Sequence, residues 1–470
     1  MQYEMVIGLE THVELSTKTK IFCGCTTAFG GEQNTHCCPV CVGLPGSLPK
    51  LNRRVVEYAV KAGLATNCEI SQVSKMDRKN YVYPDLAKAY QISQFDYPLC
   101  HHGHVTLSDG HTIRLNRIHI EEDAGKLVHE GGEVFVDYNR GGVPLIEIVT
   151  EPDFRSPEQV REYLEQLRLT MKYLNVSDCK MQEGSMRCDV NISIRPKGSD
   201  TFGTRTEIKN VNSLAFIVKA IQSEFERQVD LVESGEPVVQ ETLRYMESTN
   251  STESMRGKED SNDYRYFRDP DLPIVTVSEE EIEALRSTLP ELPREKMQRY
   301  REQWGISEKD CEQLTRYAKI AAYFEEMAEQ SAQPKLCANV MLTHLFRYLD
   351  NEEAKEAAEF PVEAAEFAKV AAMIGSGKIS NNFTKKIVDT MMEQGKPFDR
   401  LFDPSEFAAV DTGAIESVVQ KVLDANPKIV ADFRSGKEKA IGALIGVVMK
   451  ETRGKADPKT AEAMLREKMK

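Results

Sequence analysis

The chain has 470 residues, 41% of them hydrophobic and 29% charged, which predicts roughly two to four domains with apolar cores. It contains no run of about 18 apolar residues, which argues against a membrane span. The net charge of −14 argues against capture of nucleic acid by overall charge alone.

The charge is uneven along the chain. Residues 421–470 carry twelve Lys or Arg against seven Asp or Glu, a local charge of +5 on an acidic body. Such a tail suits RNA binding, although an ordinary charged helical surface explains it equally well.

The N-terminus, Met1-Gln2-Tyr3-Glu4, lacks the basic and apolar regions of a secretory signal. We therefore expect a cytoplasmic protein, whose eleven cysteines are thiols or metal ligands rather than disulfides.

The first predicted strand, Tyr3–Leu15, has one apolar and one polar face. A period of two places Met5, Ile7, Leu9, Val13 and Leu15 on the apolar face. Glu10, His12 and Glu14 share the other face, beside Gly8. A carboxylate, an imidazole and a second carboxylate in a row suit a divalent cation, and a merely solvated sheet face is the alternative.

The next chemical signal is a group of cysteines. Cys23, Cys25, Cys38 and Cys41 have the spacing Cys-x-Cys, twelve residues, Cys-x2-Cys, which predicts a structural four-thiolate zinc knuckle. His36 and Cys37 are possible substitute ligands.

Residues 75–94 and 263–271 both interleave basic side chains with tyrosines. Such segments suit a phosphate and a stacked base, or simply form a polar sheet rim. Between them, Cys100-His101-His102-Gly103-His104 resembles a metal-binding sequence. It directly precedes a hairpin predicted from Val105–Leu107 and Thr112–Leu115 around Asp109-Gly110, so we favour an exposed loop.

A second acidic cluster, His119–Lys126, ends the strand-like segment Ile113–Ile120. Together with the first strand it predicts a metal and phosphate site. Strand alternation places Glu121 and Glu122 on opposite faces, so the pattern does not decide which of them faces that site.

Regular elements continue to about residue 290. They comprise strands at Leu145–Val149, Met186–Arg195 and 206–210 and helices from Ser156 to about Leu174 and from Ser213 to Ser234, closed by Gly235. The strand at 186–195 places Arg187, Asp189, Asn191, Ser193 and Arg195 on one face, suited either to solvent or to a nucleotide.

The remainder is helical in pattern after a boundary at Pro290–Pro293. Gly375-Ser376-Gly377-Lys378 resembles the end of a P-loop, but Ala372 and Ile379 stand where the motif needs glycine and a hydroxyl residue. We interpret it as a helix cap. The predicted fold class is α+β, with domains at 1–292, 293–408 and 409–470.

Several long motifs of this chain carry a family resemblance. They are Ile7–Leu15, Asp77–Tyr81, Tyr90–Gln94, Glu121–Lys126 and Arg187–Asn191. With them, the whole chain closely resembles the B subunits of the aspartyl/glutamyl-tRNA amidotransferases.

The resemblance implies a fold and an activity. The fold is a mixed-sheet cradle similar to glutamine synthetases, followed by a helical domain and a YqeY-like tail that reaches tRNA. The activity uses ATP to phosphorylate the side-chain carboxylate of Glu-tRNA(Gln) or Asp-tRNA(Asn), after which ammonia displaces the phosphate. Metal ions offset the repulsion between the carboxylate and the γ-phosphate.

Carried onto matching positions, the resemblance implies that Glu10, His12 and Glu122 bind Mg²⁺, with Glu121 close by. Asp189, Asn191 and Glu207 belong to the nucleotide pocket, and the four cysteines match a zinc knuckle that some members carry. Because this chain shows no glutaminase signature, we expect an amidase-type A subunit to supply ammonia. The resemblance adds a small C subunit that joins A to B and completes a heterotrimer.

Two other functions remain open. A non-catalytic, zinc-stabilised RNA scaffold needs no metal at His12, and a stand-alone metal hydrolase turns over ATP without aminoacyl-tRNA. The residues do not decide between Glu-tRNA(Gln) and Asp-tRNA(Asn).

Overall fold

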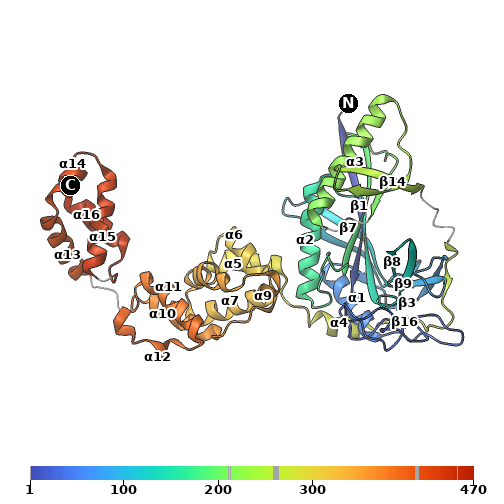
Figure 1. Ribbon diagram of the computed structural model, residues 1–470, viewed down its shortest axis with the longest axis horizontal. Coiled ribbons are helices and arrows are strands. Elements are labelled where there is room, and N and C mark those ends of the chain that lie inside the picture. Colours follow the sequence, from blue (N-terminus) through green and yellow to red (C-terminus); the bar gives the residue numbers. More distant parts are fainter. Residues whose placement is uncertain are drawn as a thin grey trace. The chain divides into compact units, whose positions relative to one another are not determined.

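The computed structural model describes residues 2–209, 211, 213–257, 264–407, 412–452 and 454–469. The chain divides into two compact units, Met1–Glu291 and Leu292–Lys470. The first unit combines strands with helices and the second is helical, which confirms the α+β class (Figure 1). Within the described ranges no helix is both long and apolar enough to cross a membrane.

A large mixed sheet organises the first unit. Its nine described strands follow the spatial order β14 (Ser251–Gly257), β13 (Glu241–Met246), β12 (Thr206–Lys209), β11 (Met186–Pro196), β1 (Tyr3–Glu14), β10 (Pro144–Thr150), β7 (Thr112–Glu122), β6 (Cys100–Thr106) and β2 (Glu69–Ile70). β12 and β13 run parallel, and the other neighbouring pairs run antiparallel. β1 therefore lies at the centre, between β11 and β10.

The predicted alternation of β1 is confirmed. Its apolar side chains Met5, Ile7, Leu9 and Val13 are buried in one core with residues of α1 (Arg53–Ala65), α2 (Pro157–Tyr173) and α3 (Leu214–Ser234). Because that core takes one face of the strand, the polar side chains face the opposite side of the sheet.

The helices of this core begin and end at the predicted residues. The side chain of Ser156 accepts a hydrogen bond from the backbone of Gln159 at the start of α2. Gly235 closes α3 with φ of 83°, a conformation that favours glycine.

Three smaller sheets and one helix complete the first unit. They are β15 (Phe267–Arg268) with β4 (Asp77–Asn80) and β5 (Tyr90–Ser93), β16 (Val275–Thr276) with β3 (Val73–Ser74), β8 (Lys126–Glu130) with β9 (Glu133–Asp137), and α4 (Glu279–Arg286). The pairing of β15 with β4 brings the two predicted basic and aromatic segments side by side. Asp263 of the second segment and Asn210 of the predicted strand 206–210 lie outside the described residues.

The loop predicted for Cys100–His104 is wrong. These residues form the first part of β6, which pairs with β7 from Cys100 to Thr106. Cys100 is buried and packs in the apolar core, which holds the start of the strand in place. The polar histidines that follow it made the segment look like an exposed loop in the sequence.

The second unit consists of helices around two hydrophobic clusters. The first cluster involves α5 (Pro293–Trp304), α6 (Glu308–Thr315), α7 (Ala318–Ser331), α8 (Pro334–Asn339), α9 (Glu352–Ala357), α10 (Ala364–Gly375), α11 (Thr384–Gln394), α12 (Phe398–Leu401) and short helical turns at Val340–Leu345, Phe346–Tyr348, Asn381–Phe383 and Pro404–Phe407. The second involves α13 (Thr412–Ala425), α14 (Pro427–Arg434), α15 (Ile441–Glu451) and α16 (Pro458–Met469). A short helical turn, Glu438–Ala440, directly precedes α15.

The stretch that resembles a P-loop ends α10, with Ser376 at the cap, as the helix-cap interpretation expects. The predicted boundary between residues 408 and 409 lies outside the described residues, and the division into three domains stays a prediction.

Candidate active site

The polar face of β1 gains acidic neighbours from both adjacent strands. The antiparallel register places His12 opposite Glu147 of β10 and Arg187 of β11, and it places Glu10 opposite Asp189 of β11. Opposed residues of neighbouring strands share a face, so these side chains form one polar row across the sheet.

The first group in this row surrounds His12. Its Nε2 lies 3.4 Å from Oε1 of Glu121 and 3.5 Å from Oε2 of Glu147. One ligand atom from each of the three residues lies within 4.8 Å of the others. His119 adjoins them, with its Nε2 3.3 Å from Glu147, while its buried Nδ1 has no hydrogen-bond partner among the described atoms.

The charges of this group are strongly coupled. Burial alone would lower the pKa of His12, but the carboxylates of Glu147 and Glu121 outweigh burial and raise it well above its ordinary value. Conversely, burial would raise the pKa of Glu147, but the imidazoles of His119 and His12 hold it well below its usual range. Because a metal ligand imidazole is neutral, a cation at this site would replace the proton on His12.

The second group lies next to the first on the same sheet face and involves β1, β11 and β12. Glu10, Asp189 and Glu207 place one carboxylate oxygen each within 4.8 Å of the others. Lys209 Nζ lies 2.7 Å from Asp189 and 3.4 Å from Glu207. Asn191 donates a hydrogen bond of 3.0 Å to Glu10.

This group carries more negative charge than its neighbours neutralise. Burial raises the pKa of Glu10, and the carboxylates of Glu147, Glu207 and Asp189 raise it further, whereas Lys209 lowers it. Three carboxylates therefore face one ammonium group, and an oxygen-preferring divalent cation fits such a donor set. The buried Oδ1 of Asn191 also has no hydrogen-bond partner among the described atoms, which leaves one further oxygen beside the group.

The structure does not bring Glu122 together with His12. Lys88 Nζ lies 2.5 Å from the Glu122 carboxylate, which also accepts a 2.9 Å hydrogen bond from the backbone of Ile92. Glu121 instead joins the His12 group, as opposite faces at successive strand positions require. The role that the resemblance implies for Glu122 stays a prediction.

The sequence patterns did not identify Glu147 as a candidate site residue. It is a single carboxylate between Ile146 and Ile148 in a strand that looks wholly buried. An isolated charge in an apolar strand requires a partner, and this signal could have identified it.

The paired basic and aromatic segments lie beside the first group. Lys79 of β4 has its Nζ 4.7 Å from the ring centroid of Tyr264, and Phe95 stacks on Tyr266 with centroids 4.3 Å apart. Burial lowers the pKa of Lys79, but Tyr266 and the carboxylates of Glu121 and Glu147 raise it above its ordinary value. An ammonium group and partly exposed aromatic rings next to carboxylates suit a phosphate and a base.

A carboxyl pair at the end of β1 predicts a pH dependence. Burial and the neighbouring Asp123 carboxylate raise the pKa of Glu14 to about 8, against the opposing charges of Arg187 and Arg140. The unfolded value is about 4.3, so between these two pH values the folded chain binds the extra proton. Raising the pH through this window therefore lowers the free energy of unfolding.

We expect Glu14→Gln to remove that dependence, so that the variant gains stability relative to the unsubstituted chain as the pH rises from 5 to 8. Free energies of unfolding from urea titrations at several pH values measure the effect. Parallel pH curves for the two chains would contradict it.

The four predicted zinc ligands lie together in the structure. Cys23, Cys25, Cys38 and Cys41 have sulfur atoms within 4.8 Å of one another, and the sulfurs of Cys38 and Cys41 are 3.9 Å apart. Cys37 lies outside this group, with its sulfur 3.8 Å from the Asn139 side chain. The cluster is compatible with a zinc site.

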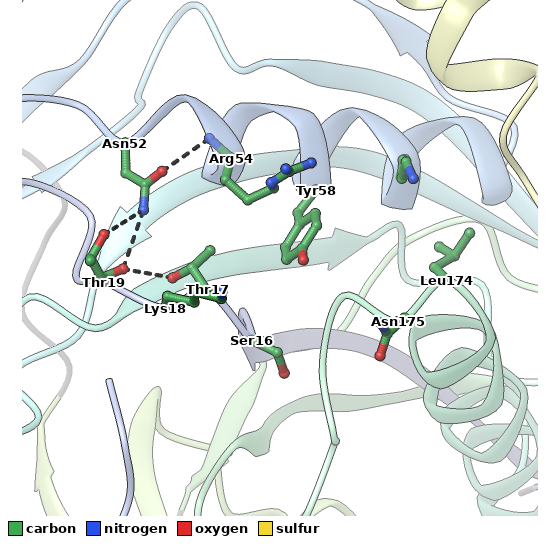
Figure 2. A pocket seen from close by; sticks show the side chains of 10 residues that line it. Ser16, Thr17, Lys18, Thr19, Asn52, Arg54, Tyr58, Leu174 and Asn175 are labelled. Carbon is green, nitrogen blue, oxygen red and sulfur yellow. Dashed lines mark hydrogen bonds between the residues drawn. The ribbon is translucent and has the colours of Figure 1, made fainter. Parts of the chain in front are cut away.

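A separate cavity of about 630 Å³ lies beside the start of α1 (Figure 2). Its lining includes Lys18, Arg54 and Lys61 and contains no carboxylate. The side chain of Asn52, which caps α1, also donates a 3.0 Å hydrogen bond to Thr19 in this lining. None of the predicted site residues lines the cavity, so it is not part of the carboxylate row.

Comparisons with known proteins relate this chain to a single family. Residues 5–283 match the family described as the GatB/GatE catalytic domain, and residues 322–469 match the family described as the GatB domain. Similar curated proteins include those of Carboxydothermus hydrogenoformans (49% identical), Caldicellulosiruptor saccharolyticus (50%) and Lachnospira eligens (51%). Each is named as the B subunit of an aspartyl/glutamyl-tRNA(Asn/Gln) amidotransferase, and each alignment covers 100% of this chain and 99% of the relative.

Proposed function

Since the chain belongs to the family of aspartyl/glutamyl-tRNA(Asn/Gln) amidotransferase B subunits, we propose that its carboxylate row is where the side chain of a misacylated tRNA is phosphorylated. The protein is the B subunit of a tRNA-dependent amidotransferase and carries its catalytic domain. The substrates are Glu-tRNA(Gln), Asp-tRNA(Asn) or both, together with ATP.

The observation that carries this proposal is the pair of three-ligand groups on one sheet face. Glu121 and Glu147 with His12 form one, and Glu10, Asp189 and Glu207 form the other. When bound there, Mg²⁺ would supply positive charge that offsets the repulsion between a carboxylate and the γ-phosphate.

The surrounding residues orient these groups. Asn191 holds Glu10 by a hydrogen bond, and Lys209 holds Asp189 by an ion pair. Lys79, beside Glu121 and Glu147, has the charge to attract a phosphate. Such fixed positions keep the charged groups in place before the substrate arrives.

The reaction balances in two steps. A carboxylate oxygen of the aminoacyl-tRNA attacks the γ-phosphorus and ADP leaves, giving an acyl phosphate. The nitrogen of ammonia then attacks the acyl carbon, phosphate leaves and the nitrogen loses a proton, giving the amide. ATP is required because a carboxylate is a poor acyl donor, whereas the acyl phosphate has a good leaving group.

The relatives are named as one lettered subunit of an amidotransferase, which supports a complex with other chains. We assign ammonia production to an amidase-type A subunit and the joining of A and B to a small C subunit. The helices at 293–408 and the tail at 409–470, where the charge is most positive, are assigned to tRNA binding in the cytoplasm.

ADP release by the assembled complex tests this function. We expect Glu-tRNA(Gln) or Asp-tRNA(Asn) to stimulate ADP formation, and uncharged tRNA to fail. ADP release that is independent of aminoacyl-tRNA would instead favour a metal hydrolase. No ADP release with either tRNA, despite tRNA binding, would favour a non-catalytic scaffold.

The cysteine group is proposed to hold a structural zinc ion. Four thiolates complete a tetrahedral site and leave no position for a substrate. Zinc present at about 1,000 times its dissociation constant stabilises the folded state by about 4 kcal/mol. We expect Cys38→Ser to lose one zinc ion per chain and about this much stability, measured by metal analysis and chemical denaturation.

Cys37→Ser is the matched control, because Cys37 is adjacent in sequence but outside the group. Zinc that is retained in Cys38→Ser, or lost equally from both variants, would contradict the assignment.

A further inference from the structure

A third group of potential metal ligands lies at the edge of the large sheet, apart from the carboxylate row. Glu69 of the edge strand β2 pairs with His101 of β6, and His102 follows on β6. Their ligand atoms lie within 4.8 Å of one another. His101 Nδ1 is 3.5 Å and His102 Nδ1 is 3.9 Å from Oε2 of Glu69.

The backbone brings the two histidines together. Successive side chains of a strand normally point to opposite faces, which would separate His101 from His102. His102, however, has φ of 53°, in the left-handed region that residues other than glycine rarely adopt. As a result the two Nδ1 atoms lie 3.3 Å apart. Residues in rarely adopted backbone conformations are often found at functional sites, so the two adjacent histidines form a candidate ligand pair.

The spacing matches a tetrahedral metal site. With metal–nitrogen distances of about 2.0–2.1 Å, tetrahedral geometry separates two ligand atoms by about 3.3–3.4 Å. The two imidazole nitrogens meet this value, whereas Glu69 Oε2 lies 0.2 Å beyond the 3.3 Å separation from His101 and 0.6 Å beyond it from His102. A small rotation of the exposed Glu69 side chain would bring its oxygen to the tetrahedral distance.

We propose that Glu69, His101 and His102 bind a zinc-class transition metal ion, with water completing the coordination. Two imidazoles and one carboxylate select zinc, copper or nickel over Mg²⁺, which prefers oxygen ligands. The site is open to exchange with solvent, since the side chains of His102 and Glu69 are 73% and 69% exposed.

The ion would join the edge strand to its neighbour. β2 has only two residues and pairs on one side with β6, so few hydrogen bonds hold it. β2 is followed along the chain by β3 and then by β4, which carries Lys79 of the candidate active site. A metal ion bound by Glu69, His101 and His102 would therefore hold β2 against β6 and so fix the start of the segment that leads to Lys79.

Zinc binding by the full-length chain tests the proposal. Equilibrium dialysis at micromolar free Zn²⁺ is applied to the unsubstituted chain, His102→Ala and Glu69→Gln. His104→Ala is the matched control, because His104 is an exposed histidine of the same strand outside the group. We expect the first two variants to bind one ion fewer, with an affinity at this site at least about tenfold weaker, and the control to match the unsubstituted chain.

Equal zinc content in all four chains would overturn the proposal, as would binding at this site only at millimolar Zn²⁺. Circular dichroism of the metal-free chains shows whether a variant has failed to fold. If a variant does not fold, anomalous X-ray scattering at the zinc edge tests for the site in crystals of the unsubstituted chain. A peak between Glu69, His101 and His102 supports the site, and no peak there overturns it.

Discussion

His12→Ala is expected to reduce the tRNA-dependent ADP release of the assembled complex by about 100-fold or more. The side chain of His12 lies between Glu121 and Glu147, so alanine leaves these two carboxylates with His119 as their one neighbouring imidazole among the described residues. A cation bound at the proposed site would lose one of three ligands, and the carboxylate and γ-phosphate would approach each other against a larger repulsion. The measurement is initial ADP release with and without Glu-tRNA(Gln).

His104→Ala is the control, since this exposed histidine of β6 is in none of the three-ligand groups of the described residues. Both variants are expected to bind tRNA like the unsubstituted chain, because neither substitution lies in the helical segments to which tRNA binding is assigned in the proposal. Equal ADP release by all three complexes would show that the polar face of β1 is only a solvated sheet surface. Loss of tRNA binding in His12→Ala would show that the effect is not local to the site.

Local patterns predicted much of this fold. The alternation of β1 required one buried face, and the core indeed takes Met5, Ile7, Leu9 and Val13. Ser156 and Gly235 mark helix ends because a cap depends on side chains and backbone within one turn. These elements are determined by neighbours in sequence, so a single sequence is enough to identify them.

The composition of the site depends on strand register, which a single sequence does not reveal. Glu147 meets His12 because β10 pairs with β1 in one particular register. A shift of one residue would turn Glu147 to the opposite face. The His101 and His102 pair depends in the same way on one left-handed residue in β6, which no pattern of polarity predicts.

The strand register also bears on whether Glu121 or Glu122 binds the metal ion, and substitutions of these carboxylates can decide between them. We expect Glu121→Gln and Glu147→Gln to raise the Mg²⁺ concentration required for half-maximal ADP release by roughly 10–100-fold, since both carboxylates lie within 3.5 Å of His12. Glutamine keeps the size of the side chain and removes its charge, so the effect reports on the ligand rather than on packing.

Glu122→Gln is the decisive comparison, because the resemblance assigns the metal to Glu122 and the geometry assigns it to Glu121. Glu122 pairs with Lys88, and its amide variant loses that ion pair while leaving the His12 group complete. We therefore expect Glu122→Gln to keep the Mg²⁺ requirement of the unsubstituted complex, whatever its effect on the maximal rate. A raised requirement in Glu122→Gln, with a normal one in Glu121→Gln, would mean that the strand end rearranges when the ion binds. The ion would then exchange Glu121 for Glu122, and Lys88 would have to release its carboxylate before the reaction begins.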